Sequence, residues 1–399
     1  MLRFDPTVLA LPFFESHHRD LALNVSDWLA GPAGSDIDAI TRDADPKVVG
    51  RKLTRLLGQA DWLRFVVPRA GDSGQPKLDV RSMCLLREAF ASYHDLLDFS
   101  FSIQGLGCAA AGLYGDVARF NQFLAASASG EMLGSFAISE PEVGSNLAAA
   151  ALEARLVDGR YVLNGVKTWV SYGNIADVHC VLVRTGEGPG AMGLSLLLVP
   201  ADTPGLTIAQ DIALIAPRAF ATLNFSNCEV AADQLVGVPG MGFKYALQIL
   251  DIYRVTVAAA AIGFCRKALR VAGQWAKSRR IGDEFLFDMQ MTKSKLADMA
   301  VYLDATSLLV ARAAWELDTR QGKDISQRDL SRHISIAKLF GTDGAQQVVD
   351  DAVQIMGAYG VVKDAEVENL YRQIRLLRIY EGTSEIQRLI IANNLNFKS

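Results

Sequence analysis

The feature that most constrains the fold is a change in hydrophobic spacing that occurs twice along the chain. Residues 1–130 place apolar side chains three and four positions apart, as helices with one buried face do. Residues 131–237 contain short β-branched and aromatic runs between glycines and prolines, and the helical spacing returns over 238–399. The sequence therefore predicts an α+β, mostly α fold of three domains: N-terminal helices, a central β-barrel-like domain and a C-terminal four-helix bundle.

Turn dipeptides organise the central block. Asp158-Gly159 and Asn164-Gly165 stand between short strand-like runs and are typical of tight hairpins, so both are predicted turns. Further strands are expected over 176–185, 193–202 and 221–230. In the last block, three long amphipathic stretches predict three long helices.

Charge and cysteine usage narrow the class of protein. The 399 residues carry a formal net charge of only −4 with no basic run, which argues against nucleic acid as a partner. The five cysteines are scattered and form no CxxC pair, as in proteins that keep their thiols reduced. The first twenty residues lack a basic segment followed by an apolar run, so we expect a cytoplasmic protein without membrane insertion.

The five histidines indicate no metal site. His17 and His18 are adjacent, so a helix is expected to point them in different directions. The other three, His94, His179 and His333, are isolated in the sequence. Packing or solvent exposure is the favoured interpretation of all five.

Two segments of the central block could carry chemistry. "FAISEPEVGSN", residues 136–146, is a polar, turn-rich loop whose N–H groups suit a phosphate or the edge of a heterocycle. Taken alone, a plain interdomain connection is the favoured explanation, because such turn chemistry is common. Trp169 and Ser171 are two apart on a predicted strand, so their side chains share a face and could flank a planar cofactor. A tryptophan that fills the core is the alternative.

The last block offers three more candidates. Asp251 and Arg254 in "LDIYR" have the spacing of an ordinary surface ion pair on a helix. Gly357 suits a helix end or a close backbone approach. Glu381 in "RIYEGTSEIQR" is either an acid at a helix start or a buried carboxylate able to take a proton from carbon, and local physics leaves this choice open.

Taken together in this order, the segments resemble motifs of the acyl-CoA dehydrogenase family over nearly the whole chain. "FAISEPEVGSN" is similar to Phe-Ala-x-Thr/Ser-Glu-Pro-x-x-Gly-Ser-Asp, "TWVS" to Trp-Ile-Thr/Ser, and "LDIYR" to Leu-Asp-x-x-Arg. "IYEGTSEIQRLIIA" is close to the family's C-terminal motif. The resemblance implies bound FAD and oxidation of an acyl thioester to its α,β-unsaturated form.

The resemblance also assigns roles to single residues. Glu381 falls on the catalytic base that removes the α-proton while the β-hydride passes to the flavin N5. The residues that it places at the cofactor are Phe136, Ile138, Ser139, Ser145, Trp169, Val170, Ser171, Arg279, Gln290, Gln354, Gly357, Thr383 and Glu385. Those that it places at the substrate are Ser145, Asp251, Arg254 and Gly382.

Partners follow from the same resemblance. The thioester carrier is CoA or an acyl carrier protein, and an electron-transfer flavoprotein is the expected acceptor. Arg279, Gln290, Gln354 and Gly357 match positions that reach FAD across a subunit boundary, which implies a homodimer or homotetramer. The alternatives are a flavin oxidase or monooxygenase of the same fold, such as an N-hydroxylase, and a non-catalytic flavoprotein. Relatives of the N-hydroxylase kind generally lose the glutamate that this chain keeps as Glu381.

Overall fold

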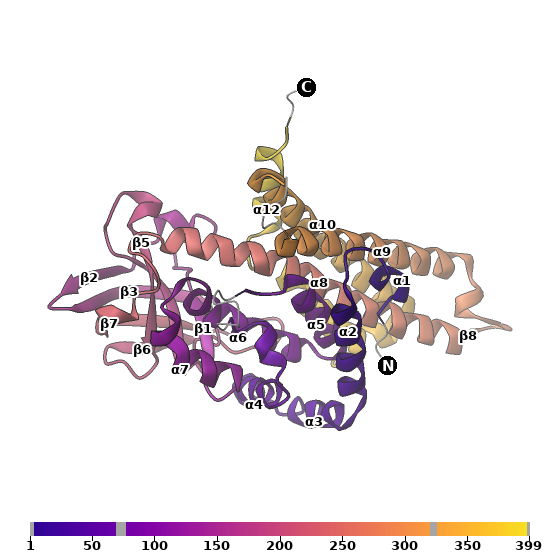
Figure 1. The fold of residues 1–399 in the computed structure, drawn as a ribbon. Coiled ribbons are helices and arrows are strands. Elements are labelled where there is room, and N and C mark those ends of the chain that lie inside the picture. Colours follow the sequence, from indigo (N-terminus) through magenta and orange to yellow (C-terminus); the bar gives the residue numbers. More distant parts are fainter. Residues whose placement is uncertain (1–3, 69–76, 320–324, 397–399) are drawn as a thin grey trace. The chain divides into compact units, whose positions relative to one another are not determined.

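A computed structural model describes residues 4–68, 77–319 and 325–396 of the chain (Figure 1). Helices come first, strands follow, and helices return, which confirms the predicted mostly helical α+β fold. The N-terminal α-helices are α1 (Pro6–Leu9), α2 (Ser16–Ala30), α3 (Pro32–Ile40), α4 (Pro46–Gln59), α5 (Val80–Tyr93), α6 (Asp95–Tyr114) and α7 (Val117–Ala128).

Aspartates fix where several of these helices begin. Asp45, Asp79 and Asp116 precede α4, α5 and α7, and each side chain accepts a backbone N–H of the first turn. Such caps satisfy donors that have no partner inside the helix, a contribution of about 1 kcal/mol each. The short polar residues between apolar stretches therefore set the helix boundaries.

Seven strands form one sheet with the order β1-β4-β2-β3-β7-β6, and β5 pairs with β4. They are β1 (Gly134–Ala137), β2 (Glu153–Val157), β3 (Arg160–Ser171), β4 (Val178–Arg184), β5 (Leu194–Pro200), β6 (Leu206–Asp211) and β7 (Phe220–Ala231). The three further strands predicted from the sequence are β4, β5 and β7, and they are confirmed. The sequence pattern missed β1 and β6.

The two predicted hairpin turns have different outcomes. Asp158 and Gly159 have φ of 47° and 77° and connect β2 to β3, as a two-residue turn with positive φ at both positions requires. The prediction of a turn at Asn164-Gly165 is wrong, because both residues lie inside β3, where the pairing with β7 shifts register. Gly165 instead marks a β-bulge with φ of 144°.

The C-terminal block confirms the three predicted long helices: α8 (Gly242–Ser278), α9 (Gln290–Thr319) and α10 (Gln327–Met356). The two-residue strands β8 (Arg280–Ile281) and β9 (Glu284–Phe285) form a hairpin between α8 and α9, and α11 (Glu366–Leu377) and α12 (Ser384–Asn393) complete the block. Small buried alanines of α8, among them Ala258 and Ala261, allow neighbouring helices to pack closely in an apolar core.

Two helices are long and apolar enough to cross a membrane by length and composition alone. The apolar windows of α6 and α8 are, however, 89% and 78% buried inside the protein. Burial of this extent is typical of core helices, so these windows are weak evidence for a membrane span.

Contacts divide the chain into two compact units. One contains the described parts of 1–34, 79–98 and 251–399, and the other those of 35–78 and 99–250. The apolar core of the first lies among α5 and α8 to α11, and that of the second is built on the sheet. The N-terminal helices are shared between the units, whereas the three domains of the sequence analysis, 1–130, 131–237 and 238–399, stay a prediction.

Candidate functional site

In the unit that contains the sheet, Glu140 holds the polar loop that follows β1. Its carboxylate accepts the backbone N–H groups of Ala151 and Leu152 at 2.8 and 3.0 Å and the Lys167 ammonium at 2.7 Å. Burial pulls the Glu140 pKa upward, but the Lys167 charge and the hydrogen bonds from Lys167, Leu152 and Ala151 together outweigh it, so the pKa is lowered. Burial lowers the Lys167 pKa to about 8, although Glu140 opposes that shift. The buried Glu140–Lys167 pair therefore holds the loop that follows β1 in place.

The same lysine belongs to the second predicted cofactor segment. Lys167 Nζ donates to the Ile138 carbonyl at 3.3 Å, and the Thr168 N–H donates to the Ser139 carbonyl at 3.0 Å. The structure therefore brings the loop after β1 together with the end of β3, two segments that sequence analysis assigned separately to a cofactor.

The predicted cofactor residues of this unit differ in accessibility. Phe136, Ile138, Ser139 and Ser171 are half-buried, and Ser145 is exposed. Val170 is buried in the sheet core, so its side chain supports the strand and only its backbone is left to meet a ligand.

Trp169 is held in an unusual conformation. It has φ of 57°, lies at a register shift between Lys167 and Val170, and leaves 59% of its surface exposed. A left-handed non-glycine residue costs on the order of 1–3 kcal/mol, and such residues cluster at ligand sites. The alternative that Trp169 fills the core is wrong, and its exposed ring suits stacking on a planar ligand.

In the other unit, Glu381 lies in the turn between α11 and α12. Its φ is 55° and that of Gly382 is 92°, a conformation that glycine adopts without strain. The N-cap of α12 is Thr383, whose hydroxyl accepts the Ile386 N–H at 3.4 Å. Glu381 is therefore not the acid that begins this helix, which removes the ordinary explanation for its carboxyl group.

Buried donors hold two consecutive carbonyls of this turn. Arg254 Nε of α8 donates to the Glu381 carbonyl at 3.1 Å. Lys338 Nζ of α10 and Gln387 Nε2 of α12 donate to the Gly382 carbonyl at 2.9 and 3.0 Å. Three helices thus fix the backbone on which the Glu381 side chain stands.

The ion pair predicted in "LDIYR" forms, but it is not a surface pair. Arg254 donates to Asp251 at 2.7 Å and is only 6% exposed, because its guanidinium turns inward to the Glu381 backbone. The spacing along α8 predicted the pair, whereas its burial depends on a turn more than a hundred residues away.

Asp343 of α10 secures both ends of the same turn. It accepts Arg378 Nε at 2.9 Å before the turn and the Ser384 hydroxyl at 2.5 Å after it. Arg388 donates to its second oxygen at 2.7 Å. These contacts explain the arginine that opens "RIYEGTSEIQR".

The Glu381 carboxyl is poorly solvated. Its Oε2 atom is inaccessible to water and has no hydrogen-bond partner among the described residues. Burial raises the Glu381 pKa to about 7, opposed by the cations Arg87, Lys338 and Arg254. A carboxyl group of this kind is present in both protonation states near neutral pH, which suits a general base.

Arg87 and Asp98 form a second charged pair near this carboxyl. The guanidinium binds both Asp98 oxygens at 2.8 Å, and its third nitrogen donates to the Thr256 hydroxyl at 3.0 Å. Arg87 lowers the Glu381 pKa more than Asp98 raises it, so the pair as a whole favours the deprotonated carboxylate.

The remaining predicted cofactor residues lie near helix ends. Glu385 is exposed in the first turn of α12. Arg279 follows α8, Gln290 begins α9, Gln354 is in the last turn of α10, and Gly357 ends that helix with φ of 59°. All four are exposed in the single chain, and their contact with a cofactor or with a second subunit stays a prediction.

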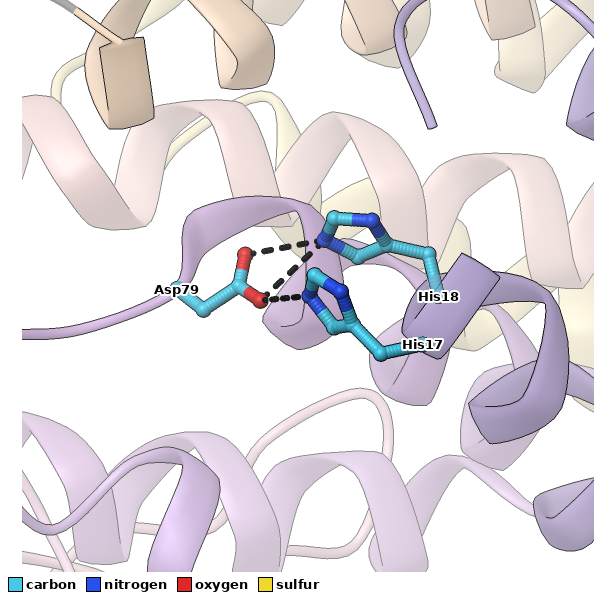
Figure 2. A group of neighbouring side chains, drawn as sticks. All are labelled: His17, His18 and Asp79. Carbon is cyan, nitrogen blue, oxygen red and sulfur yellow. Dashed lines mark hydrogen bonds and ion pairs between the residues drawn. The ribbon is translucent and has the colours of Figure 1, made fainter. Parts of the chain in front are cut away.

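Figure 2 shows that His17 and His18 point to the same carboxylate. Their Nε2 atoms both lie 3.1 Å from Asp79 Oδ2, and the ring centroids are 3.8 Å apart. The expectation that they point in different directions is wrong, because Asp79 caps α5 beside the start of α2 and both rings reach it.

This cluster is the one group of its kind that the described residues offer to a metal ion. His18 Nδ1, however, accepts the Glu15 N–H at 3.0 Å, so a neutral His18 ring carries its proton on Nε2, facing Asp79. A metal bound at Nε2 needs the lone pair that this proton occupies. The three groups are therefore a hydrogen-bonded clamp between α2 and α5.

Comparison with known proteins identifies the family. The model "Acyl-CoA dehydrogenase, middle domain" matches residues 135–228 and "Acyl-CoA dehydrogenase, C-terminal domain" matches 240–396. The rat mitochondrial short-chain specific acyl-CoA dehydrogenase is 33% identical over 348 residues, 82% of each chain. The chain belongs to the acyl-CoA dehydrogenase family. The predicted family is confirmed, and with it FAD-dependent acyl-CoA dehydrogenation as the class of reaction.

Solved structures agree on the acyl-CoA dehydrogenase fold. One chain, in a structure described as "Electron transferring flavoprotein of Acidaminococcus fermentans: Towards a mechanism of flavin-based electron bifurcation", is 28% identical with a TM-score of 0.84, and the match covers 100% of both chains. Glutaryl-CoA dehydrogenase from Mycobacterium smegmatis in complex with FADH2 is 24% identical with a TM-score of 0.83. That match covers 97% of this chain and 96% of the other and shows the shared fold.

Sequence reasoning missed three buried cations, two in the unit of Glu381 and one in the unit that contains the sheet. Arg87, Lys167 and Lys338 are all fully or almost fully buried. Each interrupts an apolar run, in "CLLREAF", "GVKTWV" and "SIAKLF". A charge inside such a run needs a partner, so this pattern could have indicated them.

Proposed function

We propose that Glu381 is the base that removes the α-proton of an acyl thioester, which this chain oxidises to the α,β-unsaturated product. The observation that carries the assignment is the Glu381 carboxyl itself, with a pKa raised by burial to about 7 and an Oε2 atom without a hydrogen-bond partner among the described residues. Such a group is deprotonated often enough at neutral pH to act, and basic enough to accept a proton from carbon.

The residues of the sheet-containing unit fit FAD. The exposed, strained Trp169 offers a ring for a planar ligand, and the half-buried Ser139 and exposed Ser145 offer hydroxyl groups from a loop fixed by Glu140. Phe136, Ile138, Val170 and Ser171 belong to the same two segments. Bound FAD supplies the acceptor for the β-hydride.

The turn at Glu381 also offers a backbone donor for the thioester carbonyl. The Glu381 N–H is the proposed donor to the thioester carbonyl, where it would stabilise the negative charge that develops as the α-proton leaves. Arg254, by holding the Glu381 carbonyl at 3.1 Å, limits rotation about this residue and keeps the amide and the carboxyl in a fixed relation.

Substrate and partners are proposed more broadly. Family membership implies an acyl-CoA substrate, and a thioester of an acyl carrier protein offers the same reacting atoms. An electron-transfer flavoprotein is the proposed acceptor, with support from the similar chain described with such a flavoprotein. We also propose a homodimer or homotetramer, in which the exposed Arg279, Gln290, Gln354 and Gly357 meet the cofactor of a neighbouring subunit, and a cytoplasmic location.

Anaerobic titration tests the proposal. Purified holoprotein is mixed with a panel of acyl-CoA and acyl carrier protein thioesters, and bleaching of the oxidised flavin is followed. We expect at least one thioester to bleach the wild type, Glu381→Gln to bind it without bleaching, and Glu366→Gln, an exposed carboxylate of α11, to behave as wild type. Failure of every thioester would overturn the reaction, and fast bleaching by Glu381→Gln would overturn the base.

A further inference from the structure

Lys338 is a buried cation for which the proposed chemistry has no direct use. It lies in the middle of α10 between apolar neighbours, and its side chain has no exposed surface. Burial lowers its pKa to about 8, and Glu381 is the first of the charges that oppose this shift. A buried amine costs several kcal/mol unless it is paired or hydrogen-bonded, so its contacts indicate what it is for.

The contact of Lys338 is next to the proposed base. Its Nζ donates to the Gly382 carbonyl at 2.9 Å, and Gln387 donates to the same oxygen at 3.0 Å. Glu381 and Gly382 both have positive φ, and Glu381 does so without the freedom of glycine. The two donors therefore hold a peptide group in an orientation that the chain would not favour by itself.

The geometry points to Lys338 as a positioning residue: it holds the Glu381–Gly382 turn in its left-handed conformation and places a positive charge beside that turn. This inference rests on the proposed role of Glu381. The hydrogen bond sets the direction of the carboxyl, and the charge favours its deprotonated form over the neutral one.

Other charges act on the two groups and must be counted with Lys338. Those that act on Glu381 are Arg87 of α5, Asp98 of α6, Arg254 of α8 and Lys338. Those that act on Lys338 are Glu381, Arg254, Asp343 of α10 and Glu385 of α12. Asp98 binds Arg87, and Asp343 binds Arg378 and Arg388, so these acids are already neutralised by other partners. Among the cations, Arg87 lowers the Glu381 pKa most and Lys338 comes next. Lys338 has no acid at ion-pair distance among the described contacts, so no ion pair offsets its charge.

Three substitutions separate the hydrogen bond from the charge. Lys338→Met removes both, Lys338→Gln keeps a donor without the charge, and Lys338→Arg keeps a charged donor. The measurement is the rate of anaerobic flavin reduction by one reactive acyl-CoA in the FAD-loaded protein, as a function of pH. Lys295→Met is the matched control, because Lys295 of α9 pairs with Asp351 and is not among the charges that act on Glu381.

We expect the pH midpoint for flavin reduction to rise by about one unit in Lys338→Met and Lys338→Gln, since the deprotonated base loses a nearby positive charge. The limiting rate at high pH should fall about ten-fold or more in Lys338→Met, and less in Lys338→Gln. Lys338→Arg and Lys295→Met should keep the wild-type midpoint.

A merely structural lysine would give a different result. Its loss would lower the thermal midpoint of unfolding and the FAD content but would leave the pH midpoint of the remaining active protein unchanged. That result in Lys338→Gln would overturn the inference, and Lys338→Gln decides the matter if Lys338→Met does not fold. A wild type that no thioester reduces would overturn the proposed function instead, so the two failures are distinguishable.

Discussion

At Glu381 the fold places a carboxyl where its charged form is poorly solvated, and this placement has a cost in stability. The ordinary pKa of 4.5 is raised to about 7 in the folded protein. Between these pH values the folded state keeps a proton that the unfolded state has lost. Stability therefore falls as the pH rises through this window and stays lower above it. The proposed catalytic base thus lowers the stability of the folded protein.

The first prediction is that Glu381→Gln stabilises the protein while it abolishes flavin reduction. Above a pH of about 7 the variant should exceed the wild type by on the order of 1–3 kcal/mol in free energy of unfolding. Below a pH of about 4.5 the two should be equal, since the glutamate is protonated in both states. Denaturant titrations across this range give the measurement. A variant that is less stable than the wild type at alkaline pH would show that the carboxylate is well solvated.

At the scale of elements, local pattern predicted the long helices and most strands. It could not distinguish an Asx-Gly dipeptide that forms a hairpin turn from one that lies at a bulge inside a strand. Asp158-Gly159 turns the chain because β2 and β3 pair with each other on either side of it. Asn164-Gly165 has the same chemistry, yet β3 continues through it, since β7 supplies partners on both sides of the bulge. The deciding partner lies about sixty residues away, where no local window reaches it.

Asp79 joins two elements, which gives the second prediction. It caps α5 through the Ser82 N–H and hydroxyl, and it binds His17 and His18 of α2. Asp79→Ala should cost about 2–4 kcal/mol of unfolding free energy, because it removes the cap and leaves the buried His18 donor without its acceptor. Asp79→Asn, which can still cap, should cost less.

The pH dependence of this loss has a defined sign. The Asp79 pKa is lowered in the folded protein: burial pulls it upward, but hydrogen bonds from His18 and Ser82 outweigh that effect. The carboxylate therefore contributes stability above its ordinary pKa of about 3.8, and this contribution is lost as the pH falls toward the folded value. The difference between Asp79→Ala and wild type should shrink in acid, and a constant difference would contradict the assignment.

At the scale of the whole molecule, the sequence motifs named candidate site residues but could not show which buried groups contact them. "LDIYR" and "YEGT" are 127 positions apart at Arg254 and Glu381, and the hydrogen bond between them appears only when α8 packs beside the last turn. Lys338 lies between them in sequence, and the apolar run "SIAKLF" indicates a buried charge there but not the partner of that charge. Its role depends on where α10 places one amine, which is a property of tertiary packing.

The last prediction concerns the link between FAD binding and the unfolding equilibrium of the chain. A ligand that binds only the folded state adds RT ln(1 + [L]/Kd), about 2.7 kcal/mol at one hundred times Kd. FAD added to apoprotein should therefore raise the thermal midpoint with increasing concentration. Trp169→Ala should weaken FAD binding about ten-fold, since stacking on the exposed ring is lost, and Met192→Ala, which removes an equally exposed side chain of the same unit, should not.

The stability of the apoprotein separates a binding role for Trp169 from a structural one. The residue is 59% exposed and its backbone has φ of 57°, so removal of the side chain forfeits little buried area and leaves the strain nearly unchanged. The free energy of unfolding of the Trp169→Ala apoprotein should thus lie within about 0.5 kcal/mol of the wild-type value. The variant should be less stable than the wild type only in the presence of FAD, because it gains less stability from binding the cofactor. If apoprotein and holoprotein lost stability equally, the tryptophan would be supporting the sheet, and the strained conformation at the end of β3 would need a cause other than the cofactor.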